Sequence, residues 1–289
     1  MFRLKLPSRT LVLGERTLIM GVLNVTPDSF SDGGQFLDSG RAAEQAIAMQ
    51  FAGADLLDIG GESTRPGSQE VPASEELDRI LPVLEGLRGR LKIPISVDTR
   101  RAAVAELALR AGAEIINDVS GLKNDPRIAE VAAQQHVPLI LMHMRGEPRT
   151  MQKTGFASDV LRDVTQGLRK SVSIAHKAGV TKPQIIFDPG IGFGKSFAQN
   201  YEVLEKLPLI AKLGYPLLVG TSRKGFLGAT LARGGTPVPP VDRIWGTAAT
   251  VTASILNGAH IVRVHDVAEM VQVARVADCF ANPRLRRSL

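Results

Sequence analysis

The chain has 289 residues, 44% of them hydrophobic and 22% charged, which fits a globular protein with one large α/β domain or two small ones. The formal net charge of +6 favours solubility or attracts anionic substrates to a basic cleft. Nucleic-acid binding is not expected, because there are only two Tyr and one Trp and the basic cluster is confined to Arg284, Arg286 and Arg287.

The single cysteine, Cys279, excludes an intramolecular disulfide and any zinc site built from several cysteines. We expect it on the buried face of the last helix, as a small apolar residue. No apolar run approaches the ~18 residues of a membrane-spanning helix, and the charged N-terminus carries no apolar segment long enough for a signal peptide. We therefore expect a cytoplasmic protein that does not bind a membrane.

The first predicted elements are two short strands. Phe2–Leu6 and Leu11–Leu13 alternate between apolar and polar residues around Pro7 and Ser8, a pattern that predicts a β-hairpin. In a barrel, such a hairpin would plug the N-terminal end, which is a structural role.

Eight short apolar runs follow, and each predicts a buried strand. They are Leu18–Leu23, Leu56–Ile59, Ile93–Val97, Glu114–Ile116, Pro138–Met142, Gln184–Phe187, Pro216–Val219 and His260–Val264. The helical patterns between them are Arg41–Phe51, Ser74–Leu87, Arg101–Ala111, Pro126–Gln135, Asp159–Lys177, Asn200–Lys212, Asp242–Asn257 and Asp266–Ala277. Several of these helices are followed by a glycine suited to a left-handed C-cap: Gly53, Gly112, Gly179, Gly214 and Gly258.

Strand alternating with helix predicts a parallel sheet, and eight such units in about 250 residues fit a closed (β/α)8 TIM barrel. We expect a single barrel domain over residues 1–289, with the β-hairpin at its N-terminus. The alternative is an open doubly wound sheet with a dinucleotide site, which needs a glycine fingerprint at the first βα turn. That turn, residues 24–30, contains no glycine, so the barrel is favoured.

Nearly every predicted strand ends in a polar or charged side chain, which a buried strand does not need for its own stability. In a barrel these ends gather on one face and would form a single polar rosette. The residues concerned are Asn24, Asp58, Asp98, Asn117, His143, Asp188, Ser222, Lys224, Arg263 and His265. The convergence indicates an active site, although any one aspartate could equally be a helix N-cap or an ion-pair partner.

Some of these residues offer hydrogen bonds to a neutral ring. Asp98, Asn117 and Asp188 supply acceptors that suit a flat heterocycle with several N–H groups, and Lys224 supplies donors from another side. For Asp58 and Asp118 we favour hydrogen bonds to neighbouring loops, and for His143 a packed structural role.

Other residues suit a phosphorylated group. Arg263 has a planar guanidinium that can stack on a ring or bind phosphate. Together with Arg65, His265 and Asn24 it would form a cationic and polar site. Neither a His-Glu-x-x-His zinc motif nor a Gly-x-Ser-x-Gly nucleophile motif is present in the sequence.

Three predicted loops on this face are long or rich in glycine, which indicates mobility or a close approach of the backbone to a ligand. They cover residues 26–34, 60–67 and 188–195. The third superficially resembles a phosphate-binding loop, but Pro189 and Lys195 break the P-loop and dinucleotide patterns respectively. Nucleotide hydrolysis and NAD-dependent chemistry are therefore not predicted.

Motifs along nearly the whole chain resemble those of the dihydropteroate synthases, a family of pterin-binding barrels. The matching segments are Asn24–Gly34, Gly60–Gly67, Ser96–Thr99, Ile115–Gly121, Met142–Met144, Phe187–Lys195, Thr221–Lys224 and Arg263–Asp266. The resemblance implies a step of folate biosynthesis in which 6-hydroxymethyl-7,8-dihydropterin diphosphate and p-aminobenzoate give 7,8-dihydropteroate and diphosphate, assisted by Mg²⁺. It also implies a homodimer and a sulfonamide target.

The resemblance also implies roles for individual residues. Pterin binding would involve Asp98, Asn117, Met142, Asp188, Lys224 and Arg263, with Asp98, Lys224 and Arg263 as catalytic residues. Diphosphate binding would involve Asn24, Arg65, Arg263 and His265, with Asn24 also on Mg²⁺. The p-aminobenzoate pocket would comprise Phe30, Thr64, Arg65, Pro66, Phe193 and Lys224, and Asp32, Thr64 and Arg65 would close over the site.

One position departs from the family pattern. Many members have Ser after the Ser-Arg-Lys triplet, where its hydroxyl helps to bind the aminobenzoate carboxylate, but this chain has Gly225. Two alternatives stay open: a catalytically inactive pterin-binding paralogue, which the Gly225 departure allows, and a methyltetrahydrofolate methyltransferase. The second would not need the intact loop motifs at 26–30 and 63–66.

Overall fold

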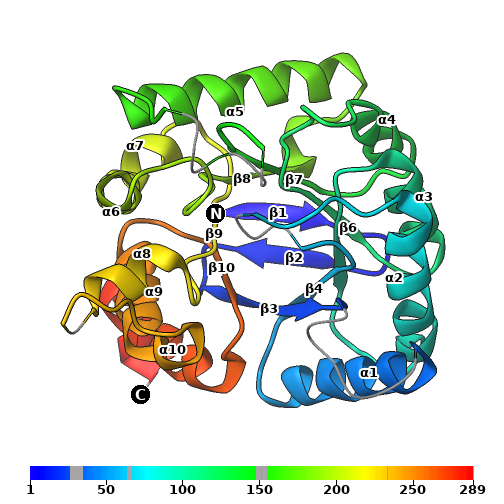
Figure 1. Cartoon of the computed structure of the whole chain (residues 1–289), viewed down its shortest axis with the longest axis horizontal. Coiled ribbons are helices and arrows are strands. Elements are labelled where there is room, and N and C mark those ends of the chain that lie inside the picture. The colour runs from blue at the N-terminus through cyan, green and yellow to red at the C-terminus, as the bar shows by residue number, and fades with distance from the viewer. Residues whose placement is uncertain (27–34, 64–66, 148–150, 152–154, 233, 289) are drawn as a thin grey trace.

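The computed structural model of the chain describes residues 1–26, 35–63, 67–147, 151, 155–232 and 234–288. Its centre is a ring of eight parallel strands (Figure 1). They are β3 (Leu18–Asn24), β4 (Leu56–Gly60), β5 (Ile95–Asp98), β6 (Ile115–Asp118), β7 (Leu139–Met142), β8 (Ile185–Asp188), β9 (Leu218–Val219) and β10 (Ile261–Val264).

The strands follow one another around the ring in chain order. Their hydrogen-bonded order is β8-β7-β6-β5-β4-β3-β10-β9. A parallel bridge between Phe187 and Leu217 joins β8 to the residue before β9, and so closes the ring. The predicted (β/α)8 TIM barrel is therefore confirmed.

Helices surround the ring on the outside (Figure 1). They are α1 (Gln35–Phe51), α2 (Ala73–Leu87), α3 (Ala102–Arg110), α4 (Arg127–Gln134), α5 (Val160–Lys177), α6 (Phe197–Glu205), α7 (Leu207–Ala211), α8 (Gly225–Thr230), α9 (Ile244–Leu256) and α10 (Val267–Ala281). Short 3₁₀ turns lie at Lys182–Gln184, Pro240–Asp242 and Leu285–Ser288.

Two helical predictions need correction. The single helix expected over Asn200–Lys212 is two helices, because Pro208 has no N–H to continue the hydrogen-bond ladder and instead stands in the first turn of α7. The short helix α8 was not predicted.

The five expected C-cap glycines all have positive φ, between 79° and 116°, as predicted.

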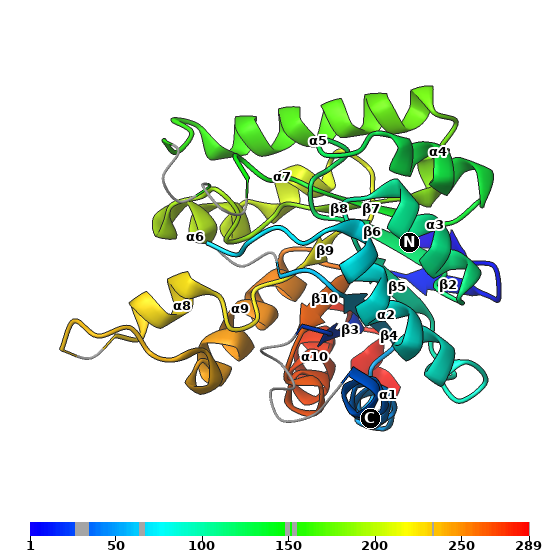
Figure 2. The ribbon, with the colours of Figure 1, turned by 45° about the vertical axis from the view of Figure 1, so that its right-hand side comes forward.

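The apolar core has two layers. One lies between the strands and the surrounding helices. The other fills the barrel and includes Leu4, Leu6 and Leu13 from the N-terminal hairpin, β1 (Phe2–Lys5) and β2 (Thr10–Leu13). Figure 2 shows this hairpin beside one end of the barrel strands, so its predicted role as a plug is confirmed.

Cys279 lies on the last long helix, α10, as expected, but it is half-buried rather than on the fully buried face. None of the described helices combines the length and the apolar character needed to cross a bilayer.

The polar side chains at the opposite end of the barrel from the hairpin are the feature of the fold that calls for a functional explanation.

Candidate functional site

Alternate residues of each strand face the barrel interior. Eight barrel-strand residues belong to the apolar cluster that fills the barrel, among them Leu56, Ile115, Ile140, Ile186 and Ile261. Because side chains of a strand point to alternate faces, the residue two positions later also points inward. Those residues are Asp58, Asn117, Met142, Asp188 and Arg263. The interior thus changes from apolar to polar at the carboxyl ends of the strands, where TIM barrels bind their ligands.

Arg263 joins the strand-end side chains into one group. Its Nε donates a hydrogen bond to Asp58 Oδ2 at 2.6 Å, and its Nη2 donates to Asp98 Oδ2 at 2.8 Å. Asn117 Nδ2 donates to the same Asp58 oxygen at 3.0 Å. These residues come from β10, β4, β5 and β6, so the structure brings them together as the sequence predicted.

Asp58 belongs to this group, and our prediction that it would bond neighbouring loops is wrong. Its side chain is 0% exposed, and its Oδ2 holds Arg263 and Asn117 from inside the barrel, while its Oδ1 has no hydrogen-bond partner among the described residues. Two-residue alternation was a signal that could have placed it, because Asp58 follows the interior residue Leu56 by two positions.

Two other strand-end residues have structural roles, as predicted. Asp118 follows Asn117 directly, so its side chain points to the opposite face of β6. It accepts hydrogen bonds from the backbone N–H groups of Ser120 and Leu122 in the following loop. His143 is buried beside Lys195, and its Nε2 lies 3.4 Å from Asp163 Oδ2 on α5.

Asn117 presents an unused acceptor to the site. Its Oδ1 is buried and has no hydrogen-bond partner among the residues that the structure describes. A buried polar atom without a partner is costly. Because Asp58 fixes the amide nitrogen of Asn117, the oxygen on the other side of the amide is available for an N–H group of a ligand.

The ionisable groups of the site have strongly perturbed proton affinities. Burial, followed by the nearby Asp58 carboxylate, raises the pKa of Asp98 to about 8, although Arg263 opposes this shift. Burial also raises the pKa of Asp188, against the hydrogen bond from the Gly190 N–H. Burial and then the charge of Arg263 lower the pKa of Lys224 to about 8. Binding of a hydrogen-bonding ligand can therefore change the protonation of this site near neutral pH.

The turn after β8 brings Phe193 and Lys224 together. The Lys224 ammonium lies 4.1 Å from the centre of the Phe193 ring, a cation–π contact. Phe193 also packs in a small apolar cluster with Met142. The turn lies close to Lys224, since a Cβ at Gly192 would be 3.1 Å from the Lys224 Cδ.

A strained turn at Arg223, which was not predicted from the sequence, orients the next residue, Lys224. Arg223 has φ of 59°, an uncommon value for a residue with a side chain. Its guanidinium is held by Asp266, and its carbonyl accepts a hydrogen bond from Arg243 Nη1 at 2.8 Å. Gly225 follows as the first residue of α8, and a Cβ there would meet no atom within 4 Å. Packing therefore does not require glycine at this position.

The residues predicted to bind a phosphorylated group are only partly described. His265 Nδ1 lies 3.0 Å from Ser222 Oγ, and Asn24 is half-buried at the end of β3. Burial and the charges of Arg263 and Arg223 lower the pKa of His265 to about 3, so the positive charge of this predicted site comes from its arginines. Five predicted site residues lie outside the described residues: Phe30, Asp32, Thr64, Arg65 and Pro66.

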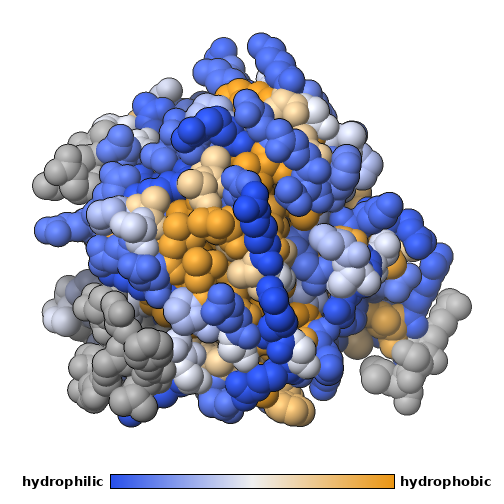
Figure 3. Space-filling model, turned by 90° about the vertical axis from the view of Figure 1, so that its right-hand side faces the viewer, coloured by the Kyte–Doolittle hydropathy of each residue, from blue (hydrophilic) through white to orange (hydrophobic). Residues whose placement is uncertain are grey.

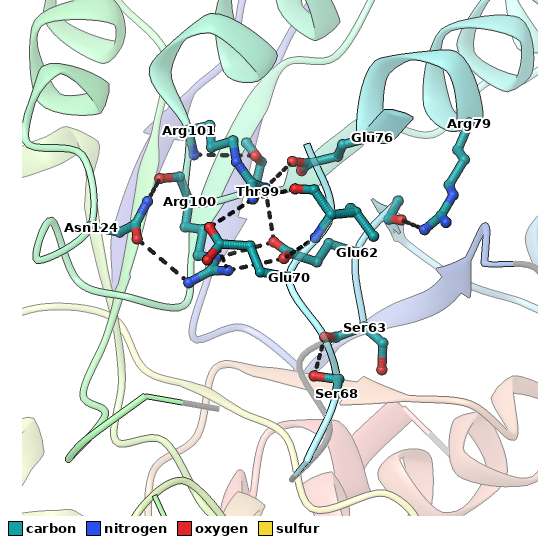
Figure 4. A network of polar contacts seen from close by, with 12 residues as sticks. Glu62, Ser63, Ser68, Glu70, Glu76, Arg79, Thr99, Arg100, Arg101 and Asn124 are labelled. Carbon is teal, nitrogen blue, oxygen red and sulfur yellow. Dashed lines mark hydrogen bonds and ion pairs between the residues drawn. The ribbon is translucent and has the colours of Figure 1, made fainter. Parts of the chain in front are cut away.

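A buried ion cluster fixes both ends of the segment after β4 (Figure 4). Arg101 Nη1 contacts Glu62 Oε2 at 2.9 Å and Glu76 Oε2 at 2.5 Å. Its Nη2 contacts Glu70 Oε1 at 3.0 Å and the Val71 carbonyl at 2.6 Å. The start and the end of segment 62–71 are therefore joined through one guanidinium.

Arg100 strengthens the same cluster. Its Nε and Nη2 donate to the two Glu62 carboxylate oxygens at 3.1 and 2.9 Å. Burial alone would raise the pKa of Glu62, but the hydrogen bonds from Arg100 and Arg101 outweigh it and lower the pKa. Arg100 and Arg101 follow Asp98 closely in the chain, so the cluster links the segment after β4 to the strand end that carries Asp98.

Comparison with known proteins gives a consistent result. Residues 20–265 match the model of the family described as pterin binding enzyme. Dihydropteroate synthase from Synechocystis sp. is 50% identical over 265 residues, covering 92% of this chain and 90% of that protein.

Solved structures agree in both fold and sequence. The Yersinia pestis dihydropteroate synthase with a sulfonamide drug complex has a TM-score of 0.89 and 41% identity, covering 98% of this chain and 100% of that one. The Xanthomonas albilineans dihydropteroate synthase with 4-aminobenzoic acid also has a TM-score of 0.89 and 41% identity, covering 97% and 98% of the two chains.

The ion cluster gives a test of stability. Replacing Arg101 by Met leaves the buried Glu76 carboxylate without its arginine partner, while Glu62 keeps Arg100, so we expect the free energy of unfolding to fall by about 3–5 kcal/mol. Urea denaturation followed by circular dichroism measures this change. The matched control is Arg90→Met, which breaks an exposed pair with Glu44 and should change stability by less than about 1 kcal/mol. Equal effects of the two variants would contradict the assignment.

Proposed function

The chain belongs to the dihydropteroate synthase family, and on this premise we propose that it condenses 6-hydroxymethyl-7,8-dihydropterin diphosphate with p-aminobenzoate to give 7,8-dihydropteroate and diphosphate in folate biosynthesis. The observation that carries the proposal is the meeting of Asp98, Asn117 and Arg263 in the mouth of the barrel. Asp188 and Lys224 complete the set from the next strand ends.

The pterin ring would occupy the polar end of the barrel. Its N–H groups would donate to Asp98, Asp188 and the unpartnered Asn117 Oδ1. Met142 supplies an apolar wall. Arg263 is held flat by two carboxylates, which suits a guanidinium that stacks on the face of a ring.

The diphosphate would lie beside the ring, toward β3 and β10. Arg263 supplies positive charge there, and neutral His265 supplies a hydrogen bond. Asn24 and Arg65 belong to the same proposed subsite, although Arg65 lies outside the described residues.

Mg²⁺ fits this subsite as an ion carried largely by the substrate. Among the described residues, no group of three or more His, Cys, Asp or Glu is arranged to hold a metal ion. Mg²⁺ commonly uses only one or two protein oxygens and takes the remainder from phosphates and water. Asn24 would supply one amide oxygen, and the ion would neutralise charge on the diphosphate.

The p-aminobenzoate would lie against Phe193 and Lys224, with Phe30, Thr64, Arg65 and Pro66 completing its pocket. The contact between the Phe193 ring and the Lys224 ammonium places an aromatic surface next to a cation, which suits an aromatic carboxylate. The same pocket would accept sulfonamides, in line with the drug complex of the Yersinia pestis relative.

The weak nucleophilicity of an arylamine determines the mechanism that we propose. Diphosphate leaves ahead of nitrogen attack, and positive charge spreads over the pterin methylene and ring. Asp98 and the neighbouring acceptors stabilise this charge electrostatically. Arg263 and His265 stabilise the departing oxygens, and the loops exclude water that would trap the cation.

A direct assay tests the proposed function. Purified protein should release diphosphate only when the pterin diphosphate and p-aminobenzoate are both present with Mg²⁺. Tight pterin binding without diphosphate release would indicate the inactive paralogue instead. Methyl transfer from methyltetrahydrofolate without condensation would indicate the methyltransferase.

Asp98→Asn tests the electrostatic part of the mechanism. The amide keeps the shape of the side chain but removes its negative charge, so we expect turnover to fall at least ~100-fold, the usual loss for one preorganised group. Steady-state diphosphate release measures the effect. Turnover equal to wild type would refute the role of Asp98.

The raised pKa of Asp98 predicts a pH-dependent affinity for the pterin ring. Ring N–H groups prefer the ionised carboxylate, so below pH 8 binding must release the proton that Asp98 carries in the free protein. Affinity should therefore fall as the pH drops below about 8, by up to tenfold per pH unit. Calorimetry of a pterin analogue in two buffers measures the released proton. Asp98→Asn should lose this dependence, and an unchanged pH profile in that variant would exclude Asp98 as its source.

The proposal includes a cytoplasmic homodimer formed through α9 and α10. Val276 and Phe280 are 62% and 72% exposed and lie four residues apart on one face of α10, and Leu256 of α9 is 51% exposed. The face covered by α2, α3 and α4 also carries an apolar patch, surrounded by mainly hydrophilic side chains (Figure 3). The exposed apolar side chains of α9 and α10 come from neighbouring helices near the C-terminus and suit self-association.

The oligomeric state tests this part of the proposal. Phe280→Asp should convert a dimer into a monomer, as measured by light scattering after size-exclusion chromatography. Leu107→Asp places the same charge at an exposed leucine of α3 and should leave the dimer intact. A monomeric wild-type protein, or a dimer unaffected by Phe280→Asp, would contradict the proposed interface.

A further inference from the structure

Lys195 is a buried lysine for which the proposed mechanism has no use, and burial lowers its pKa to about 7. Its side chain is among the most buried in the protein, with 1% of the residue exposed. A buried ammonium is strongly unfavourable unless hydrogen bonds satisfy it. Here Nζ lies 2.8 Å from the Gly190 carbonyl, 3.2 Å from the Phe193 carbonyl and 3.4 Å from the His143 carbonyl. It also lies 3.2 Å from His143 Nδ1.

These contacts hold the turn after β8 against the end of β7. Two of the carbonyls belong to the turn, residues 190–194, and the third belongs to His143 after β7. The two segments touch directly, since a Cβ at Gly190 would lie 1.9 Å from the His143 carbonyl oxygen. A Cβ at Gly194 would lie 2.1 Å from the Arg145 carbonyl oxygen. The ammonium therefore stabilises a close contact that only glycine permits.

His143 extends the connection to α5. Burial and then the charge of Lys195 lower the pKa of His143 to about 2, so the ring is neutral. When Lys195 is protonated, Nδ1 of His143 accepts a hydrogen bond from its ammonium, and the ring proton is then on Nε2, which lies 3.4 Å from Asp163 Oδ2. Lys195, His143 and Asp163 thus form a chain of contacts from the turn to a helix of the outer layer.

The turn carries groups that face both proposed substrates. The Gly190 N–H donates to Asp188 Oδ1 at 2.7 Å and so orients a carboxylate of the pterin site. Phe193 places its ring 4.1 Å from the Lys224 ammonium, on the aminobenzoate side. The conformation of one turn therefore sets the positions of Asp188, Phe193 and Lys224 relative to one another.

We propose that Lys195 is a positioning residue: by binding the carbonyls of Gly190, Phe193 and His143, it fixes the turn that orients Asp188 and the Phe193–Lys224 pair. This inference rests on the proposed function for its effect on substrates. Packing alone does not call for lysine here, because a well-packed apolar side chain is commonly as stable as a buried charge.

Lys195→Met tests the proposal, because Met has similar length but no hydrogen-bond donor. We expect the KM for p-aminobenzoate to rise at least tenfold and the affinity for a pterin analogue to fall. Binding of inorganic diphosphate with Mg²⁺ should stay within twofold of wild type, because Asn24, Arg263 and His265 lie on other strands. A loss of structure alone would weaken all three ligands together. Lys177→Met, an exposed lysine at the end of α5, is the matched control and should behave as wild type.

Lys195→Gln provides a second variant if Met prevents folding. Its neutral amide can still donate to two carbonyls, so its KM for p-aminobenzoate should lie between those of wild type and Lys195→Met, or simply above wild type if Met does not fold. Wild-type kinetics in either folded variant, equal loss of all three ligands, or failure of both variants to fold would overturn the positioning role.

A crystal structure of the folded variant separates this inference from the proposed function. We expect the Phe193 ring to move away from the Lys224 ammonium, a result that does not depend on any assay. If wild-type protein releases no diphosphate, the proposed function fails, yet the displaced turn would still support the role of Lys195 in positioning. An unchanged turn would overturn that role even in an active enzyme.

Discussion

The contact of Arg263 with Asp58 and Asp98 is the interaction on which the proposed site depends. One guanidinium from β10 binds the carboxyl groups of Asp58 on β4 and Asp98 on β5, with contacts of 2.6 and 2.8 Å. Breaking a buried pair by removing one partner leaves an uncompensated charge, so the strand ends are strongly coupled. Asp58 is wholly buried, and its charge keeps Arg263 in place before any ligand binds. The ligand therefore meets side chains that are already oriented.

Two further basic side chains, one half-buried and one fully buried, fix the loops around this centre. Arg101 joins the two ends of the segment after β4, and Lys195 fixes the turn after β8. Each side chain binds groups from separate parts of the chain. Each also lies a few residues after a strand end of the site: Arg101 follows Asp98, and Lys195 follows Asp188. We infer that contacts of basic side chains, as well as apolar packing, hold the mouth of the barrel together. Glu62 is the partner of Arg101, and His143 is the partner of Lys195.

The sequence predicted the architecture well because strand and helix periodicity are local signals. It also predicted that Asp98, Asn117 and Asp188 would converge, since strand ends share one face of a barrel. It misplaced Asp58, although alternation from Leu56 could have identified it. The cluster around Arg101 was out of reach, because its partners are distant in the chain. Lys195 lies in a glycine-rich loop, where nothing local distinguishes a buried lysine from an exposed one.

A crystal structure with a bound pterin analogue tests the central claim most directly. The account predicts that the ring lies between Met142 and Arg263, with its N–H groups within hydrogen-bond distance of Asp98, Asn117 and Asp188, while Arg263 keeps its contact with Asp58. An analogue bound elsewhere on the protein, or a ring that engages the strand ends only after Arg263 has left Asp58, would contradict the preorganised site.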